Sequence, residues 1–108
     1  MNHSKTKYVS HLGSDEEVNI HLYPIDGYTM DEYDFTCEIF CSSARKQVVP
    51  KNKMERVNAN NYRVWVHTSL VGIGNVNIRV VAKIPNARCD DGYRDVVAYL
   101  DPNMEIQK

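Results

Sequence analysis

Hydrophobic and polar residues alternate along much of this chain, most clearly between residues 60 and 85. One face of the first run in that stretch carries Tyr62, Val64 and Val66. The opposite face of the same run carries Arg63, Trp65 and His67. Alternation with a period of two, in β-branched and aromatic residues, predicts strands with one buried face. A second such run follows a loop that contains Gly72 and Gly74, so the two runs predict an antiparallel hairpin with strands at 62–68 and 75–84.

The same pattern predicts further short strands, at 6–11, 18–23, 33–41, 45–49, 53–58 and 94–100. Their expected core faces include Phe35, Cys37, Ile39, Val96, Ala98 and Leu100. Glycine, proline and aspartate mark the turns between them, as at Asp91-Gly92. No segment has convincing helical periodicity. Short strands with a turn about every ten residues favour an all-β fold, an immunoglobulin-like antiparallel β-sandwich of about seven strands, with a β-barrel as the alternative.

The chain has 108 residues, which is enough for one hydrophobic core. We expect an N-terminal arm at residues 1–14, a single β-sandwich domain at 15–108, and a tail after Asp101-Pro102. No apolar run approaches the roughly 20 residues of a membrane span. No apolar stretch follows the N-terminal Lys5 and Lys7, so we expect no signal peptide and maturation in a cytoplasm.

Chemistry-bearing residues form no catalytic pattern. The chain has three cysteines, and Cys37 and Cys41 lie about 13 Å apart along one predicted strand, beyond the roughly 7 Å that a disulfide spans. The four histidines are dispersed in the sequence, and no serine or cysteine lies in a nucleophile elbow. We therefore expect no enzyme, no metal and no cofactor. The loop residues Gly72, Gly74, Asp91 and Gly92 are interpreted as structural turns and not as phosphate or calcium ligands.

Charge is distributed unevenly, although the net charge is −1. The segment 8–44 has eight acidic residues and no Lys or Arg, whereas the segment 45–108 has eleven Lys and Arg against six Asp and Glu. Such a chain could dock head to tail on copies of itself through complementary fields. Alternatively, the two halves become adjacent strands and pair within one molecule.

Trp65 is the residue most indicative of an interface. If Tyr62, Val64 and Val66 fill the core, Trp65 lies on the opposite face of the strand with Arg63 and His67. An exposed Trp beside an Arg is common in protein interfaces. The alternative is that a loop covers Trp65. Arg45 and Lys46 begin a basic segment that we add to the candidate interface. No RNA- or DNA-binding signature accompanies that segment, so we expect no nucleic-acid partner.

Several motifs in order resemble those of one family. They are the acidic-Phe strand at Asp34-Phe35, the Val64-Trp65-Val66 strand, the Gly72-Ile73-Gly74 turn, the apolar strand that ends in Ile84-Pro85, and the Asp91-Gly92-Tyr93-Arg94 turn. This order, over residues 34–100, resembles small structural proteins of crAss-like phages, which infect gut Bacteroidetes. The chain departs from the pattern at His67-Thr68, where an acidic residue is more usual, and at Val71, which looks inserted before the glycine turn.

The resemblance implies a non-enzymatic virion component with an immunoglobulin-like fold, assembled in the host cytoplasm. We expect a capsid auxiliary (decoration) protein whose partners are the phage major capsid protein and neighbouring virion proteins, with possible self-contacts and no membrane. A tail or baseplate attachment module is the alternative. A carbohydrate-binding module is a third hypothesis, but the abundant tyrosines fall in different predicted elements and form no evident strip.

Overall fold

The computed structural model describes residues 7–108, and most of them lie in β-strands. The strands are β1 (Tyr8–His11), β2 (Asp15–His21), β3 (Asp34–Ser42), β4 (Arg45–Pro50), β5 (Glu55–Asn58), β6 (Asn61–His67), β7 (Gly74–Asn75), β8 (Asn77–Pro85), β9 (Tyr93–Leu100) and β10 (Met104–Gln107). Three short helical segments connect them: the 3-10 helices η1 (Met30–Glu32) and η2 (Lys51–Lys53), and the single turn α1 (Thr68–Val71). The expected all-β sandwich is confirmed.

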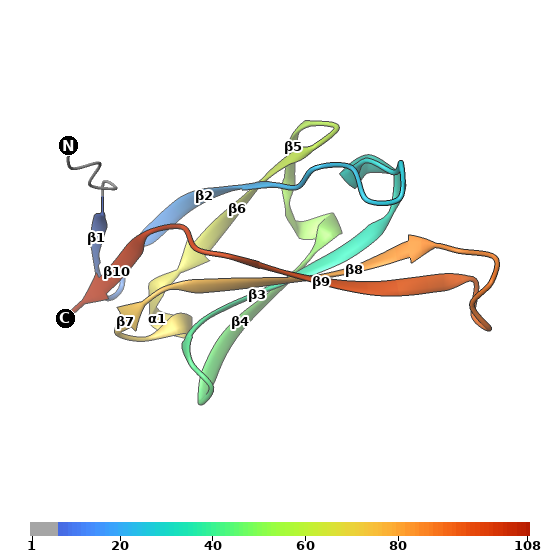
Figure 1. Cartoon of the computed structure of the whole chain (residues 1–108). Helices are drawn as coiled ribbons and strands as arrows, with labels where there is room; N and C mark the ends of the chain where they lie inside the picture. Colours follow the sequence, from blue (N-terminus) through green and yellow to red (C-terminus); the bar gives the residue numbers. More distant parts are fainter. Residues whose placement is uncertain (1–6) are drawn as a thin grey trace, which may run out of the picture.

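Two sheets form the body of the sandwich, with strand orders β4-β3-β8-β9 and β2-β6-β5. A smaller sheet, β1-β10-β7, closes one end (Figure 1). Three hairpins, β3–β4, β5–β6 and β8–β9, join neighbours within the main sheets, and the other connections cross between sheets. This order matches the immunoglobulin arrangement, in which one sheet holds strands B, E and D and the other holds C′, C, F and G.

One hydrophobic core lies between the sheets and draws on both. The expected inward residues of 62–66 and of 33–41 are buried: Tyr62, Val64, Val66, Phe35, Cys37 and Ile39. Strand β8 adds Ile78, Val80, Ala82 and Ile84, each at most 1% exposed. Each of these strands has its solvent face on the other parity, because successive side chains of a strand point to opposite sides. The expected core face of β9 is only half-buried.

The predicted hairpin between 62–68 and 75–84 is wrong. Strand β6 pairs with β2 and β5, whereas β8 pairs with β3 and β9, so the two strands lie in different sheets. The helical turn α1, which the sequence did not predict, joins them and ends at Gly72, whose φ of 93° suits glycine. Both strands bury one face in the same core from opposite sides. Alternation therefore identified their buried faces, but it carries no information about pairing partners.

The expected C-terminal tail is also wrong. Met104 and Ile106 are buried, and their strand β10 pairs with β7 and, in parallel, with β1. Of the expected N-terminal arm, residues 1–6 lie outside the described part of the chain. Tyr8 to His11 form β1, opposite Met104 to Gln107. Strand β1 falls within the strand predicted at 6–11, whereas β10, with four residues and two apolar positions, was too short for periodicity to reveal it.

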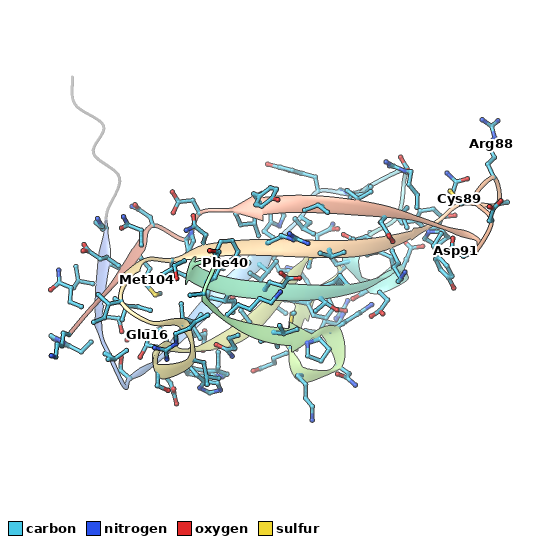
Figure 2. The ribbon with its side chains drawn as sticks, turned by 90° about the horizontal axis from the view of Figure 1, so that it is seen from below. Glu16, Phe40, Arg88, Cys89, Asp91 and Met104 are labelled. Atoms are coloured by element: carbon cyan, nitrogen blue, oxygen red, sulfur yellow. The ribbon has the colours of Figure 1, made fainter. Side chains whose placement is uncertain are left out.

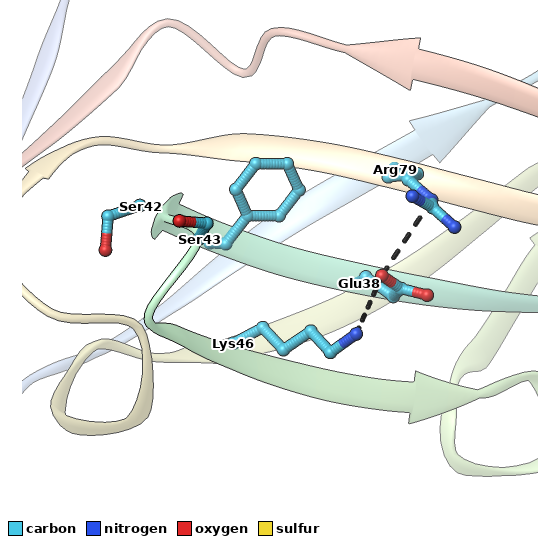
Figure 3. Close-up of a pocket in the computed structure, with 6 residues that line it drawn as sticks. Glu38, Ser42, Ser43, Lys46 and Arg79 are labelled. Atoms are coloured by element: carbon cyan, nitrogen blue, oxygen red, sulfur yellow. Dashed lines mark hydrogen bonds and ion pairs between the residues drawn. The ribbon is translucent and has the colours of Figure 1, made fainter.

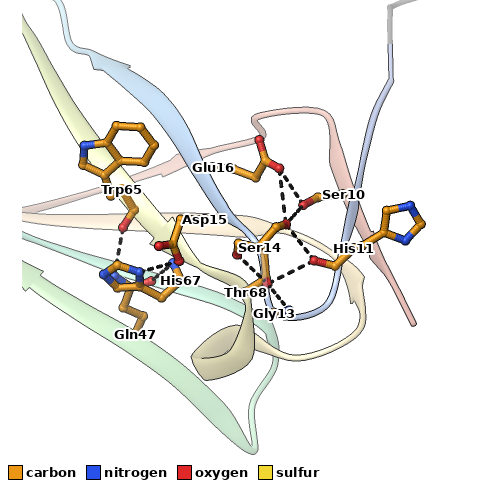
Figure 4. A network of polar contacts seen from close by, with 10 residues as sticks. All are labelled: Ser10, His11, Gly13, Ser14, Asp15, Glu16, Gln47, Trp65, His67 and Thr68. Atoms are coloured by element: carbon orange, nitrogen blue, oxygen red, sulfur yellow. Dashed lines mark hydrogen bonds and ion pairs between the residues drawn. The ribbon is translucent and has the colours of Figure 1, made fainter.

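Thr68 fastens the turn between β1 and β2 to the end of β6 (Figure 4). Its side chain is fully buried, accepts a hydrogen bond from the Gly13 N–H at 2.8 Å and donates to the Ser14 carbonyl at 2.7 Å. Beside it, the buried hydroxyl of Ser10 donates to Glu16 Oε1 at 2.8 Å. The hydroxyl of Thr68 thus pairs with one backbone donor and one backbone acceptor of the turn.

We expect Thr68→Val to lower the free energy of unfolding by about 1–3 kcal/mol, because the isosteric side chain removes the hydroxyl that accepts from the Gly13 N–H and donates to the Ser14 carbonyl. Thr68→Ser keeps the hydroxyl and serves as the control, with a smaller loss. Urea denaturation measures the difference. Hydrogen exchange should quicken first at the turn that includes Gly13 and Ser14. An unfolding free energy for Thr68→Val equal to that of Thr68→Ser would contradict the role of this hydroxyl.

Candidate functional site

The outward side of the β2-β6-β5 sheet presents the three interface residues expected on 62–68. We call Arg63, Trp65 and His67 the Trp65 face, together with the acidic residues that pair with them, which are Asp15, Glu17 and Glu55. Trp65 is 49% exposed and lies opposite Glu17 of β2 in the antiparallel register. No loop among residues 7–108 buries it, so the covered alternative does not hold for the described part of the chain.

Polar side-chain pairs border the indole of Trp65 on both sides along β6. On one side Arg63 Nε lies 2.9 Å from Glu17 Oε1, and Arg63 Nη1 lies 3.4 Å from Glu55 Oε1. On the other side His67 Nδ1 lies 2.8 Å from Asp15 Oδ1. These pairs hold long side chains in place around a large apolar ring, although exposed pairs add little to stability.

Gln47 supports the Trp65 face from behind. It is a buried residue of β4, in the other sheet, yet its side-chain amide completes the free edge of β6 (Figure 4). Nε2 donates to the Trp65 carbonyl at 3.0 Å, and Oε1 accepts from the His67 N–H at 2.8 Å. One amide thus satisfies the backbone donor and acceptor that a neighbouring strand would otherwise pair. The backbone that carries Trp65 is therefore fixed to both sheets.

The other two expected interface residues lie elsewhere. Arg45, at the start of β4, donates to the Ser69 carbonyl of α1. Lys46 lies on the outward side of the β4-β3-β8-β9 sheet, where its Nζ is 3.2 Å from Glu38 Oε1. The structure thus places three of the five candidates on the Trp65 face, Lys46 on the outward side of the other sheet and Arg45 beside α1, and does not gather them into one site.

That outward side of the four-stranded sheet has a shallow depression of about 280 Å³ (Figure 3). Glu38 lies at its centre, between Lys46 and Arg79. Phe40 also lines it. The Arg79 Nε is 3.8 Å from the Glu38 carboxylate. The depression is open, and its charged groups pair with one another, so it offers no enclosed cavity for a small substrate.

The acidic and basic halves of the chain pair within one molecule. Acidic residues of the first half meet basic residues of the second half at Glu17–Arg63, Asp26–Arg94, Asp31–Arg56, Glu38–Lys46 and Glu38–Arg79. Of the two explanations for the charge asymmetry, the internal one accounts for these contacts. The asymmetry therefore gives no support to head-to-tail docking.

Lys51 is the centre of a polar cluster at the far end of the sandwich from β1. Its ammonium donates to three backbone carbonyls, those of Met30 at 2.9 Å, Asp31 at 3.2 Å and Tyr33 at 2.8 Å. It also lies 5.5 Å from the centre of the Phe35 ring, within the range of a cation–π contact. This lysine ties the loop between β2 and β3 to the segment after β4, which is a structural role.

Asp31 belongs to the same cluster and accepts from both Arg56 and Tyr62. Arg56 Nε donates to both carboxylate oxygens at 2.9 Å, and the Tyr62 hydroxyl donates to Oδ1 at 2.6 Å. The hydrogen bond from Arg56, followed by that from Tyr62, lowers the pKa of Asp31 from 3.8 to about 2. Burial, with the hydrogen bond to Asp31, raises the pKa of Tyr62 to about 12. At neutral pH both pKa shifts therefore keep Asp31 charged and Tyr62 protonated, which are the states in which this hydrogen bond forms.

The unfolding free energy should fall with acid in the window set by Asp31. Its carboxylate binds a proton near pH 3.8 in the unfolded chain but only near pH 2 in the folded one. Its stabilising contribution is therefore complete above about pH 4 and is lost as the pH falls toward about 2. Asp31→Asn should flatten that part of the stability curve, measured by urea denaturation between about pH 5 and about pH 2.

Asp34→Asn is the matched control for this experiment. It removes a nearby exposed carboxylate that makes no hydrogen bond or ion pair with residues 7–108. We expect the wild-type acid slope to persist in that variant. If Asp31→Asn kept the same slope as the wild type, the pairing of Asp31 would not govern the acid response.

The expected turn residues lie at chain reversals. Gly72 ends α1, and Gly74, with a φ of 129°, begins β7. Asp91 and Gly92 belong to the tip that joins β8 to β9, which projects from the body of the sandwich beside Arg88 and Cys89 (Figure 2). Asp91 Oδ1 accepts from the Tyr93 N–H at 3.0 Å, a local turn contact. All four positions thus have backbone roles.

Residues 7–108 contain free cysteines but no metal-binding cluster. No cluster of three or more His, Cys, Asp or Glu side chains is placed to hold a metal ion in that part of the chain. All three cysteines are free thiols, and burial raises the pKa of Cys37 to about 12. A thiol with so high a pKa is a poor nucleophile. Within residues 7–108, no helix is long and apolar enough to span a bilayer.

The tyrosines do not form one row. Tyr33 is buried, whereas Tyr23 lies after β2 and is 80% exposed. Tyr93 and Tyr99 share the outward side of β9 but are six residues, or about 20 Å, apart along the strand. A glycan-binding strip of stacked aromatics is therefore not present among the described residues.

No family model, curated protein or solved structure matches this chain.

Sequence reasoning placed Trp65 correctly on a solvent face, but it missed the residues that support that face. Gln47 looked like one polar member of a short basic strand. Its amide acts across the sandwich, on a strand about 20 positions away, so no local pattern marks it. Lys51 belongs to the basic segment that begins at Arg45, and no neighbour in sequence indicates that backbone carbonyls bind its ammonium.

Proposed function

We propose that this chain is a non-enzymatic structural protein that binds another protein through the Trp65 face. The specific role that we propose is that of a capsid auxiliary protein, bound to the major capsid protein lattice of a virion assembled in the host cytoplasm. One observation carries the proposal: a half-exposed Trp lies on a sheet whose backbone is fixed from behind, with paired polar side chains around it.

This arrangement has the anatomy of an interface centre. Residues that dominate binding energies are enriched in Trp, Tyr and Arg and are surrounded by polar contacts that exclude water. At the Trp65 face the ring is the apolar centre and the pairs made by Arg63 and His67 are the rim. Because Gln47 fixes the backbone of Trp65, little conformational entropy is lost when a partner covers the ring.

The nature of the partner comes from the resemblance to small virion proteins of crAss-like phages. A small sandwich with one flat binding face suits a protein that repeats many times on a shell. No nucleic acid, membrane or cofactor takes part in the proposed role. The shallow, internally paired depression on the other sheet favours a protein surface over a small molecule as ligand.

Co-sedimentation with shells tests the proposal. Shells assembled from the major capsid protein encoded in the same genome are mixed with increasing amounts of the purified chain. We expect saturable binding at a fixed ratio to the lattice unit. Absence of binding to shells, together with binding to purified tails or to a glycan array, would contradict the capsid role and assign the chain to the tail or glycan-binding alternative.

A further inference from the structure

Strand β9 is an end strand of the four-stranded sheet, and its outer edge has no backbone partner among residues 7–108. It pairs with β8 at every position from Tyr93 to Leu100, in an unshifted register. No described hydrogen bond joins its other side to a further segment. The strand therefore presents a row of backbone N–H and C=O groups that another strand can pair.

The other end strands of the two main sheets carry features that discourage such pairing. Strand β4 begins with Arg45 and Lys46 and ends at Pro50. Strand β2 begins with three consecutive acidic residues, and β5 has only four residues. Lysines, prolines, clustered charges and short length are the usual protections of a sheet edge.

Strand β9 has none of these protections over most of its length. It has eight residues without Lys or Pro, and its two charges, Arg94 and Asp95, lie near its start. The segment from Val96 to Leu100 is entirely apolar. A long, regular and apolar edge is the kind that pairs with another strand.

Both faces of β9 are incompletely covered. On the outward face Val97 is 45% exposed and Tyr99 is 70% exposed. On the inward face Val96, Ala98 and Leu100 are only half-buried, whereas the facing positions of β8 are fully buried. An open space of about 200 Å³ also separates Leu100 from β2 at this margin. A strand added beside β9 would bury apolar surface on both faces at once.

We propose that two copies of this chain pair through β9, antiparallel and about a two-fold axis, to form one continuous eight-stranded sheet. A second copy fits because identical strands related by a two-fold axis present the same groups to each other. The net charge of −1 offers little repulsion between copies. This inference goes beyond the proposed function and does not depend on the identity of the shell.

The side chains of β9 restrict the register of this pairing, and the register centred on Val97 pairs apolar residues at its centre without opposing like charges. Side chains on the same face must meet, so only registers centred on one residue are allowed. Centring on Val97 places Val96 opposite Ala98 and Asp95 opposite Tyr99, with no like charges facing. Centring on Asp95 would place that carboxylate opposite itself, and centring on Ala98 would place it opposite Asp101, which disfavours both.

Sedimentation equilibrium or light scattering over a range of concentrations tests the pairing. We expect the wild type to convert from monomer to dimer, with a dissociation constant in the micromolar range. Val97→Lys puts two like charges face to face at the centre and should raise that constant at least about tenfold. Mixing Val97→Lys with Val97→Glu should restore a dimer that neither variant forms alone.

Val48→Lys is the control variant. Val48 lies on the outward side of the same sheet, is 53% exposed and belongs to the opposite end strand β4. If the copies pair through the β9 edge, Val48→Lys leaves the dimer unaffected. If the copies instead stack their sheets face to face, Val48→Lys weakens the dimer. The inference is overturned by a wild type that stays monomeric at millimolar concentration, by dissociation in Val48→Lys, or by a Val97→Lys and Val97→Glu mixture that fails to associate.

Discussion

Trp65→Ala is expected to weaken binding to capsid shells by between about 30-fold and about 1000-fold, which corresponds to the roughly 2–4 kcal/mol of a central interface residue. The ring is half exposed in the free chain and would become covered in the complex. Truncation of the ring removes apolar contact with the partner, whereas the polar pairs of Arg63 and His67 around it remain. Co-sedimentation at several chain concentrations measures the change in the dissociation constant.

Tyr23→Ala is the matched control for that prediction. Tyr23 is the more exposed aromatic, at 80%, but it lies in the loop after β2, outside the Trp65 face. We expect its replacement to change shell binding by less than about threefold, in line with the many near-neutral surface positions of a protein. Equal losses for the two variants, or an unchanged affinity for Trp65→Ala, would show that the Trp65 face is not the docking surface.

Lys51→Met is expected to lower the free energy of unfolding by about 2–4 kcal/mol, because it removes charge-assisted hydrogen bonds to the carbonyls of Met30, Asp31 and Tyr33. The methionine keeps an unbranched stem of similar length, so the packing against Phe35 is largely retained. The loss therefore reports the ammonium itself and the backbone carbonyls that it leaves unpaired. Urea denaturation at neutral pH measures it.

Lys53→Met separates that effect from a general change in surface charge. Lys53 is exposed, and its ammonium makes no hydrogen bond or ion pair with residues 7–108. Its replacement should alter the unfolding free energy by no more than about 0.5 kcal/mol. If Lys51→Met and Lys53→Met were equally mild, the carbonyl contacts of Lys51 would have no energetic importance.

Much of the fold could be predicted from the sequence, because which residues of a strand face the core is a local property. Alternation placed Val64 and Val66 in the core and Trp65 outside it, as the structure has them. The spacing of turn signals likewise identified a sandwich of short strands. These conclusions need only neighbouring residues, and the burial of one face imposes the pattern directly on them.

The alternation of residues does not determine which strands pair with one another. The segments that became β6 and β8 have the pattern of a hairpin, yet α1 and Gly72 carry the chain from one sheet to the other. Whether a short connection reverses within a sheet or crosses to the facing sheet depends on which strands already occupy each edge. That is a property of the whole topology, so the two strands could be recognised but not paired.

The residues that support the candidate site also lie far in sequence from the residues that they contact. Gln47 acts on β6 from β4, and Thr68 acts on the turn near Gly13, more than 50 residues away. A lone Gln or Thr in an alternating run has no sequence mark that distinguishes a buried bridge from a solvated side chain. Geometry supplies that distinction, because only the folded chain brings the partners within hydrogen-bond distance.

The fluorescence of Trp65 during shell binding tests the central claim most directly. The chain has one Trp, so its emission reports this residue alone as shells of Trp-free major capsid protein, or shells with their own emission subtracted, are added. We predict a shift of the emission to shorter wavelength and protection from acrylamide quenching, because the ring leaves water when the partner covers it. Saturable binding with an unchanged emission spectrum and unchanged quenching would contradict the account, since the chain would then dock through another surface.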